Sequence, residues 1–172
     1  MSFDNQWIEW DHSMENPVFH CKTCIVLDKC LFVENKKPPL PLHLNCHCEV
    51  KPVSFEKVKA QAKAFCDINK FIGYIFSNKP EYVKNGKKAA FEKRGFYLRD
   101  SELLKEEFEK QALEKYLKGE YKLGKLNKYG QHIDIVVSLN LDGRKMNPFR
   151  TGWMIKKNGR ITNNTPFTGF IE

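Results

Sequence analysis

Residues 131–141 carry the feature that most constrains the fold of this chain. Every second residue is apolar, and these positions are Ile133, Ile135, Val137, Leu139 and Leu141. A period of two with β-branched residues on one face predicts a half-buried β-strand. Asp142-Gly143 follows at once, and this dipeptide is typical of a tight hairpin turn. We therefore expect the middle of an antiparallel sheet with one dry face and one wet face. His132, Asp134, Val136, Ser138 and Asn140 should lie on the wet face.

The segments around this strand predict helices first and sheet second. Residues 101–118 form the clearest helix, with Ser101 as its cap and an apolar residue at every fourth position. Ser54 should cap an earlier helix over 55–65, and shorter helical segments should cover 69–76, with Phe71, Ile72 and Ile75 inward, and 89–93. Residues 121–129 suit a loop or an edge strand. Strands over 149–156 and from 160 onward complete a meander, joined by Asn158-Gly159. This order predicts an α+β fold with helices packed on an antiparallel β-meander.

Five of the six cysteines lie between residues 21 and 48. A Cys-x-x-Cys pair at Cys21 and Cys24 is followed about twenty residues later by His43, Cys46 and Cys48. This spacing is typical of a tetrahedral zinc site, and metal would stabilise a segment too short and proline-rich to have much core. We expect Cys21, Cys24, His43 and Cys46 to bind a structural zinc ion, with Cys48 as the substitute for Cys46. Cys30 and His47 are predicted not to bind it, and His12 and His20 are predicted to lie on the surface. Disulfides or reduced cysteines in a loop are the alternative.

The charge is unevenly distributed along the chain. Residues 1–54 carry a net charge of −2, and residues 55–172 carry +10. We therefore divide the chain into a cysteine-rich zinc-binding module, 1–54, and a basic α+β domain, 55–172. A basic domain favours polyanionic partners, nucleic acid first, although lysine-rich helices also serve solubility. No apolar run is long enough to span a bilayer and no secretion signal is visible, so neither a membrane partner nor export is expected.

The cysteine-rich segment resembles the C-terminal end of phage Mu-type minor head proteins. The resemblance covers about residues 7–50 and rests on Trp7, Trp10 and the stretches 16–24 and 38–48, which contain the Cys-x-x-Cys and a proline-rich His-x-Asn-Cys-x-Cys motif. Cys30 is an additional cysteine, and the large helical body of that family is absent. The resemblance implies phage or prophage origin, phage head components as partners, and a cytoplasmic or virion-associated location.

The basic part resembles small domains at the C-terminal ends of polymorphic toxins and phage head proteins. The resemblance covers about residues 68–170, and its motifs are Asn78-Lys79-Pro80, Gly86 to Phe91, Gly95-Phe96, Tyr129-Gly130, Arg150 to Ile155 and Thr165-Pro166. It implies the nuclease fold shared by barnase, EndoU and RelE-like toxins, and an immunity protein as a partner. The family has a histidine where this chain has Lys79, which puts any role of that histidine in doubt.

Metal-independent RNA cleavage needs a general base, a general acid and cations around the phosphorane. We expect His132 on the wet face to act as base or acid, and Lys88 and Arg150 to bind phosphate. Thr151 and Thr165 should donate hydrogen bonds, although Arg150 and Thr151 alternate and only one can face the site. Tyr121 and Tyr129 lie among lysines and could stack bases, with RNA favoured over DNA. The leading prediction is a toxin-type ribonuclease. A non-enzymatic nucleic-acid- or protein-binding module and an inactive virion head component stay open.

Overall fold

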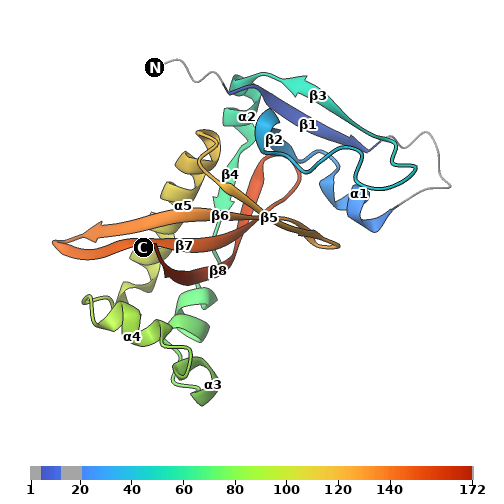
Figure 1. Ribbon diagram of the computed structural model, residues 1–172. Helices are drawn as coiled ribbons and strands as arrows, with labels where there is room; N and C mark the ends of the chain where they lie inside the picture. The colour runs from blue at the N-terminus through green and yellow to red at the C-terminus, as the bar shows by residue number, and fades with distance from the viewer. Residues whose placement is uncertain (1–4, 13–20, 172) are drawn as a thin grey trace.

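The computed structural model describes residues 5–12 and 21–171, and it forms two sheets with helices on one side of the larger (Figure 1). The N-terminal elements are β1 (Trp7–His12), α1 (Lys22–Leu27), β2 (Leu31–Val33), the 3-10 helix η1 (Glu34–Lys36) and β3 (Cys48–Val53). The following elements are α2 (Phe55–Gln61), β4 (Lys63–Phe65), the π-helix η2 (Phe71–Ile75), α3 (Pro80–Val83), α4 (Lys87–Glu92), the 3-10 helix η3 (Leu98–Asp100) and α5 (Ser101–Leu117). The chain ends with β5 (Lys122–Asn127), β6 (Gly130–Leu141), β7 (Arg144–Ile155) and β8 (Arg160–Phe170). The predicted α+β class is confirmed.

The larger sheet has five strands in the order β4-β8-β7-β6-β5. Its centre is the predicted meander, because β6, β7 and β8 pair antiparallel in sequence order. Both hairpin dipeptides turn as predicted. Asp142 and Gly143 have φ of 52° and 77°, and Asn158 and Gly159 have φ of 57° and 71°. Two successive positive φ values match the right-handed twist of the strands that they join. A loop and an edge strand are the two predictions for residues 121–129, and the structure has an edge strand over residues 122–127.

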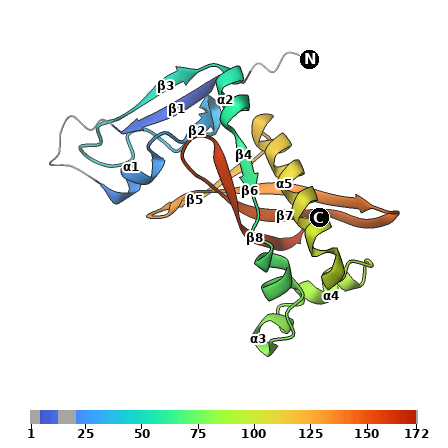
Figure 2. The same cartoon turned by 180° about the vertical axis from the view of Figure 1, so that it is seen from behind.

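Helix α5 covers the dry face of this sheet, as Figure 2 shows from behind. Its buried residues recur at the predicted spacing and are Leu104, Phe108, Ala112 and Tyr116. Phe108 contacts Phe149 of β7 at 5.8 Å between ring centroids. Within residues 5–12 and 21–171, no helix of this length covers the wet face, so the alternation predicted for residues 131–141 decides which side chains reach solvent.

Three local predictions are wrong. The helix after Ser54 ends at Gln61, and residues 63–65 form an edge strand parallel to β8. Hydrogen bonding to β8 is a tertiary effect that helical periodicity does not reveal. Asp100, not Ser101, is the N-cap of α5, and Ser101 instead donates a hydrogen bond to the carbonyl of Leu98. Ile72 is 47% exposed, whereas Phe71 and Ile75 are buried as expected.

The N-terminal part forms a three-stranded antiparallel sheet of order β2-β1-β3, with the buried indole of Trp10 beneath it. The buried residues of both predicted parts belong to one hydrophobic core. Tyr116 of α5 joins them, since its hydroxyl donates to the carbonyl of Leu31 and its ring meets Trp7 edge to face. The backbone amide of Asn158 donates to the carbonyl of Lys29 at a second point of contact. The cysteine-rich part therefore has a fixed position on the larger sheet.

Candidate functional site

Cys24 is the centre of a cluster of metal-binding side chains. Its Sγ lies 3.1 Å from Nε2 of His43 and 3.9 Å from Sγ of Cys46. Cys21, Cys24 and His43 hold their ligand atoms within 4.8 Å of one another, so this group could hold a metal ion. The structure thus brings together three of the predicted ligands, Cys21, Cys24 and His43, and places Cys46 beside Cys24 but outside this group.

A second group, His12, Cys24 and Cys48, shares the thiol of Cys24 and could also hold a metal ion. Nδ1 of His12 lies 3.6 Å from Sγ of Cys48. The prediction that His12 lies on the surface is wrong, because its side chain is only 5% exposed. The antiparallel pairing of β1 with β3 places His12 opposite Cys48, and sequence spacing cannot reveal that register. His20 lies outside the described residues.

The local backbone prepares Cys21 for metal binding. Its thiol accepts a hydrogen bond from the backbone N–H of Cys24, and this lowers the pKa of Cys21 to about 7. Burial has the opposite effect on Cys24, whose pKa it raises. Burial also raises the pKa of Cys48, and the neighbouring indole N–H of Trp10 opposes that rise. A divalent cation would favour the thiolate form of all three.

Cys30 and His47 belong to neither metal-binding group of the described residues. Cys30 is buried, and its thiol donates to the carbonyl of Val26 at 3.4 Å. His47 is exposed. Cys66 is also buried and lies away from the cluster, in the core that α5 and β4 share.

His132 lies on the wet face of β6 with both ring nitrogens in contact with amides. Its Nε2 is 3.1 Å from Nδ2 of Asn127, and its Nδ1 is 3.0 Å from Nδ2 of Asn164. A neutral imidazole donates at one nitrogen and accepts at the other, so one of these amides must present its oxygen. Rotation of an amide can therefore satisfy either protonation state of the ring. This environment holds the imidazole in place on the wet face.

The other predicted catalytic residues do not all join His132. Thr165 does lie on the same face, where it pairs with Gly152 of β7 next to Asn164. Arg150 lies further along the face, opposite Val136, in a separate pocket with Asp134. Lys88 on α4 hydrogen-bonds Asn78 and pairs with Glu92.

Thr151 faces the core and is 0% exposed. Its hydroxyl donates to the carbonyl of Ile135 at 2.8 Å and accepts from the indole N–H of Trp153 at 2.8 Å. The prediction that Thr151 donates a hydrogen bond to a substrate is therefore not supported, because both functions of its hydroxyl are used inside the fold. The expected alternation of Arg150 and Thr151 decides this outcome, since Arg150 is the member of the pair that reaches solvent.

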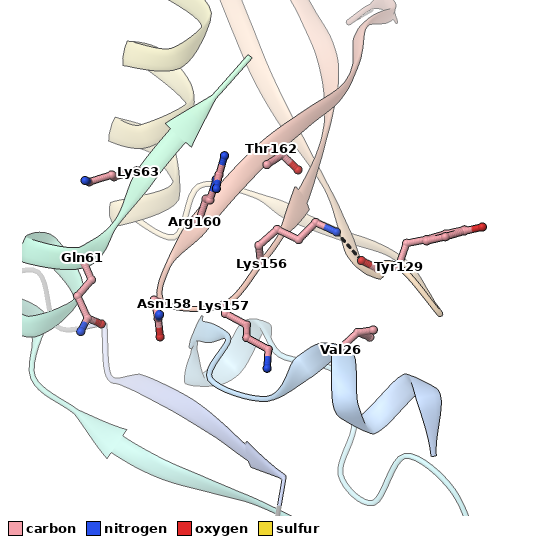
Figure 3. Close-up of a pocket in the computed structure, with 9 residues that line it drawn as sticks. All are labelled: Val26, Gln61, Lys63, Tyr129, Lys156, Lys157, Asn158, Arg160 and Thr162. Atoms are coloured by element: carbon pink, nitrogen blue, oxygen red, sulfur yellow. Dashed lines mark hydrogen bonds between the residues drawn. The ribbon is translucent and has the colours of Figure 1, made fainter. Parts of the chain in front are cut away.

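A basic pocket of about 670 Å³ opens where β8, β4 and the turn before β6 meet α1 (Figure 3). Its lining residues are Val26, Gln61, Lys63, Tyr129, Lys156, Lys157, Asn158, Arg160 and Thr162. Four of the nine carry a positive charge and none carries a negative one. Lys157 pairs with Asp28 at 3.5 Å, and Lys156 donates to the backbone carbonyl of Tyr129 at 2.6 Å. The pocket is therefore a cationic site with few acidic neighbours to neutralise it.

Exposed aromatic rings accompany these cations. Tyr129 is 61% exposed, and the ammonium of Lys128 lies 5.0 Å from its ring centroid. On the other side of the pocket, the guanidinium of Arg160 lies 5.4 Å from the ring of Phe65. Figure 3 shows Arg160 and Thr162 projecting from β8 between β4 and the Tyr129 turn.

Register connects this pocket with His132. Met154 of β7 pairs with His132 on one side and with Thr162 on the other. Two strand spacings separate His132 from Thr162, which is about 10 Å. A polymer that lies across the strands could therefore contact the basic pocket and the imidazole together.

No family model, curated protein or solved structure matches this chain. Its function is therefore inferred from the sequence and the geometry of this chain alone. No helix in the described ranges, 5–12 and 21–171, is long and apolar enough to cross a membrane.

Sequence reasoning missed most of the basic pocket. Lys63, Lys156 and Arg160 come from three segments, and nothing in the spacing of lysines marks them as neighbours. For Tyr129 the sequence predicts only that it is one of two tyrosines among lysines that could stack bases. The available signal was the dipeptide Asn158-Gly159, because a hairpin turn brings the residues on its two sides together.

Proposed function

We propose that this chain binds RNA in the basic pocket at the start of β8 and along the adjoining wet face of the larger sheet. The pocket itself carries the proposal, because it gathers Lys63, Lys156, Lys157 and Arg160 next to the exposed ring of Tyr129. Lysine and arginine side chains bind phosphates regardless of sequence, and an exposed tyrosine stacks on an unpaired base. Together these features favour a single-stranded polynucleotide over a protein ligand.

The wet face extends the binding surface beyond this pocket. Lys70 donates to the carbonyl of Asn164 and lines a second pocket with Tyr74, Tyr82 and Thr165. A third pocket contains Lys36, Lys122 and Arg150. His132 lies near all three pockets. Met154 pairs with both His132 and Thr162 of the basic pocket, Asn164 of the second pocket contacts the imidazole, and Asp134 of the third pocket is two residues along β6. A bound strand would therefore pass close to the imidazole.

RNA cleavage is the second candidate function, and the position of His132 favours it. The imidazole would take the proton of the ribose 2′-OH as its oxygen attacks phosphorus, and the 5′-oxygen would leave with a proton from a general acid. Asn127 and Asn164 hold the ring, and Thr165 lies on the same face next to Asn164, where its hydroxyl could donate to the substrate. This arrangement supports the toxin-type ribonuclease that the resemblance implies. Such an enzyme would need an immunity protein, for which the basic pocket is a suitable target.

We further propose that zinc is the metal of the cysteine-rich module. Thiolate and imidazole donors suit Zn²⁺, and four protein ligands would fill its tetrahedral positions and leave none open for a substrate. The role of the metal is structural. It would fix α1 and β3, and α1 contributes Val26 to the wall of the basic pocket.

Binding and cleavage can be tested together with the full chain and total RNA in EDTA-free buffer and then in EDTA. We expect salt-sensitive binding, and we expect Arg160→Ala to reduce the slope of log affinity against log salt by about 1. Lys145→Ala is the matched control, since Lys145 is an exposed lysine of the hairpin outside the pocket. Binding without cleavage would leave a non-enzymatic RNA-binding protein. Absence of both at micromolar protein would contradict the proposal and favour a virion component.

A further inference from the structure

We propose that the cysteine-rich module holds two metal ions in one cluster, with the thiolates of Cys24 and Cys46 shared between them. This extends the proposed zinc site and rests on it. One ion would be bound by Cys21 and His43, and the other by His12 and Cys48. The two shared sulfurs would complete four ligands around each ion.

The arrangement of the six side chains supports this assignment. Cys24 belongs to both groups of metal-binding residues among those described, one with Cys21 and His43 and one with His12 and Cys48. Cys46 belongs to neither group, but its Sγ lies 3.9 Å from that of Cys24. The cluster thus has Cys24 at its centre, one Cys–His pair on each side, and Cys46 next to the shared thiol.

The separations fit tetrahedral coordination. Zn–S and Zn–N bond lengths imply edges of about 3.8 Å between two sulfurs and about 3.6 Å between sulfur and nitrogen. Sγ of Cys24 and Cys46 are 3.9 Å apart, and Sγ of Cys48 is 3.6 Å from Nδ1 of His12. Sγ of Cys24 and Nε2 of His43, at 3.1 Å, can separate slightly to admit an ion. Each group of three ligands therefore has the dimensions of a metal site, and Cys46 is close enough to Cys24 to share an ion with it.

Two divalent cations match the charge of these ligands. With both ions bound, all four cysteines could be thiolates, and the two cations would neutralise their four negative charges. A single ion held by Cys21, Cys24, His43 and Cys46 would leave Cys48 and His12 in the core without a metal, although both are buried. The indole N–H of Trp10 is buried without an acceptor at normal hydrogen-bond distance among the described residues. A thiolate at the neighbouring Cys48 would give it a charged acceptor.

Metal stoichiometry of the full chain decides between the two arrangements. Native mass spectrometry and elemental analysis of protein purified with Zn²⁺ should give two ions per chain. One ion per chain would overturn the shared cluster and leave the single zinc site intact. No bound metal would overturn both proposals. After exchange with ¹¹³Cd²⁺, we expect two cadmium resonances, both coupled to the β-protons of Cys24 and Cys46.

Variants separate the two halves. His12→Ala should reduce the content from two ions to one, and His47→Ala should leave it at two. Two ions in the His12→Ala protein would contradict the ligand assignment. Since His12→Ala could impair folding, the stoichiometry and the cadmium spectrum of the unaltered chain provide a test that does not depend on it.

Discussion

Nδ1 of His132 on β6 lies 3.0 Å from Nδ2 of Asn164 on β8, across the intervening strand β7. The contact is possible because Asn164 lies between Asn163 and Thr165, where the pairing of β7 with β8 shifts register. A β-bulge redirects a side chain, and such bulges are common beside functional sites. Here it aims an amide at the one histidine of the wet face.

His132→Ala should reduce RNA cleavage by about 10²–10⁴-fold, the usual contribution of a general acid or base. RNA affinity should change little, because the cations of the basic pocket remain. The measurement is the rate of cleavage of total RNA in buffer without added divalent metal ions, together with a binding titration. Asn140→Ala, an exposed change on the same strand, should cleave at the normal rate. Full cleavage by His132→Ala would assign the chemistry to another residue.

Tyr129→Ala should weaken binding of single-stranded RNA by about 1–3 kcal/mol, because one stacking platform is lost. Tyr129→Phe should restore most of the affinity, since it keeps the ring. Fluorescence anisotropy with a short unstructured RNA measures both. The exposed Tyr97 lies outside the pocket lining, so Tyr97→Ala is a suitable control. Equal losses from Tyr97→Ala and Tyr129→Ala would argue against stacking at this pocket.

Thr151→Val should lower the free energy of unfolding by about 1–3 kcal/mol, because the buried indole N–H of Trp153 loses its acceptor. RNA binding and cleavage per folded molecule should be unchanged. Urea unfolding gives the stability, and Thr168→Val at an exposed position of β8 is the control. A selective loss of cleavage in stable Thr151→Val protein would restore the catalytic role predicted from the sequence.

Cys24→Ser should remove metal and lower the melting temperature more than any other single cysteine change in the module, because Cys24 is common to both groups of ligands. Cys30→Ala should keep the metal content, since its thiol donates to the carbonyl of Val26 and Cys30 belongs to neither metal-binding group of the described residues. Elemental analysis and thermal unfolding compare the two. Chelation should lower the melting temperature of Cys30→Ala protein and leave that of Cys24→Ser nearly unchanged.

The ion pair between Asp100 and Arg144 predicts a pH dependence of stability. Burial opposes ionisation of Asp100, but the N–H of Tyr97 and the guanidinium of Arg144 outweigh it and lower the pKa of the carboxyl. The folded-state pKa thus lies below the unfolded value of about 3.9. The stabilisation is complete well above pH 4 and is lost as the pH falls through the folded-state pKa. The free energy of unfolding should be larger for the unaltered chain than for Asp100→Asn at pH 7, and this difference should shrink towards pH 3. A constant difference would contradict the linkage.

The sequence alone determined the meander and the face of each strand residue. Alternation over 131–141 and the two hairpin dipeptides are local signals, because side-chain direction has a period of two and type I′ turns need particular residues. The same local logic placed Cys21 beside Cys24 and His132 towards solvent. These features would be predicted correctly without any knowledge of tertiary contacts.

Tertiary structure decided the composition of each site. His12 joins Cys48 through the register of β1 against β3, and Asn164 reaches His132 through a bulge two strands away. Lys63 meets Arg160 because residues 63–65 pair with β8 instead of extending a helix. Each of these contacts joins residues at least 32 positions apart in the chain. Periodicity reports which way a side chain points, but pairing between distant strands depends on the packing of the whole core, and that packing fixes which side chains meet.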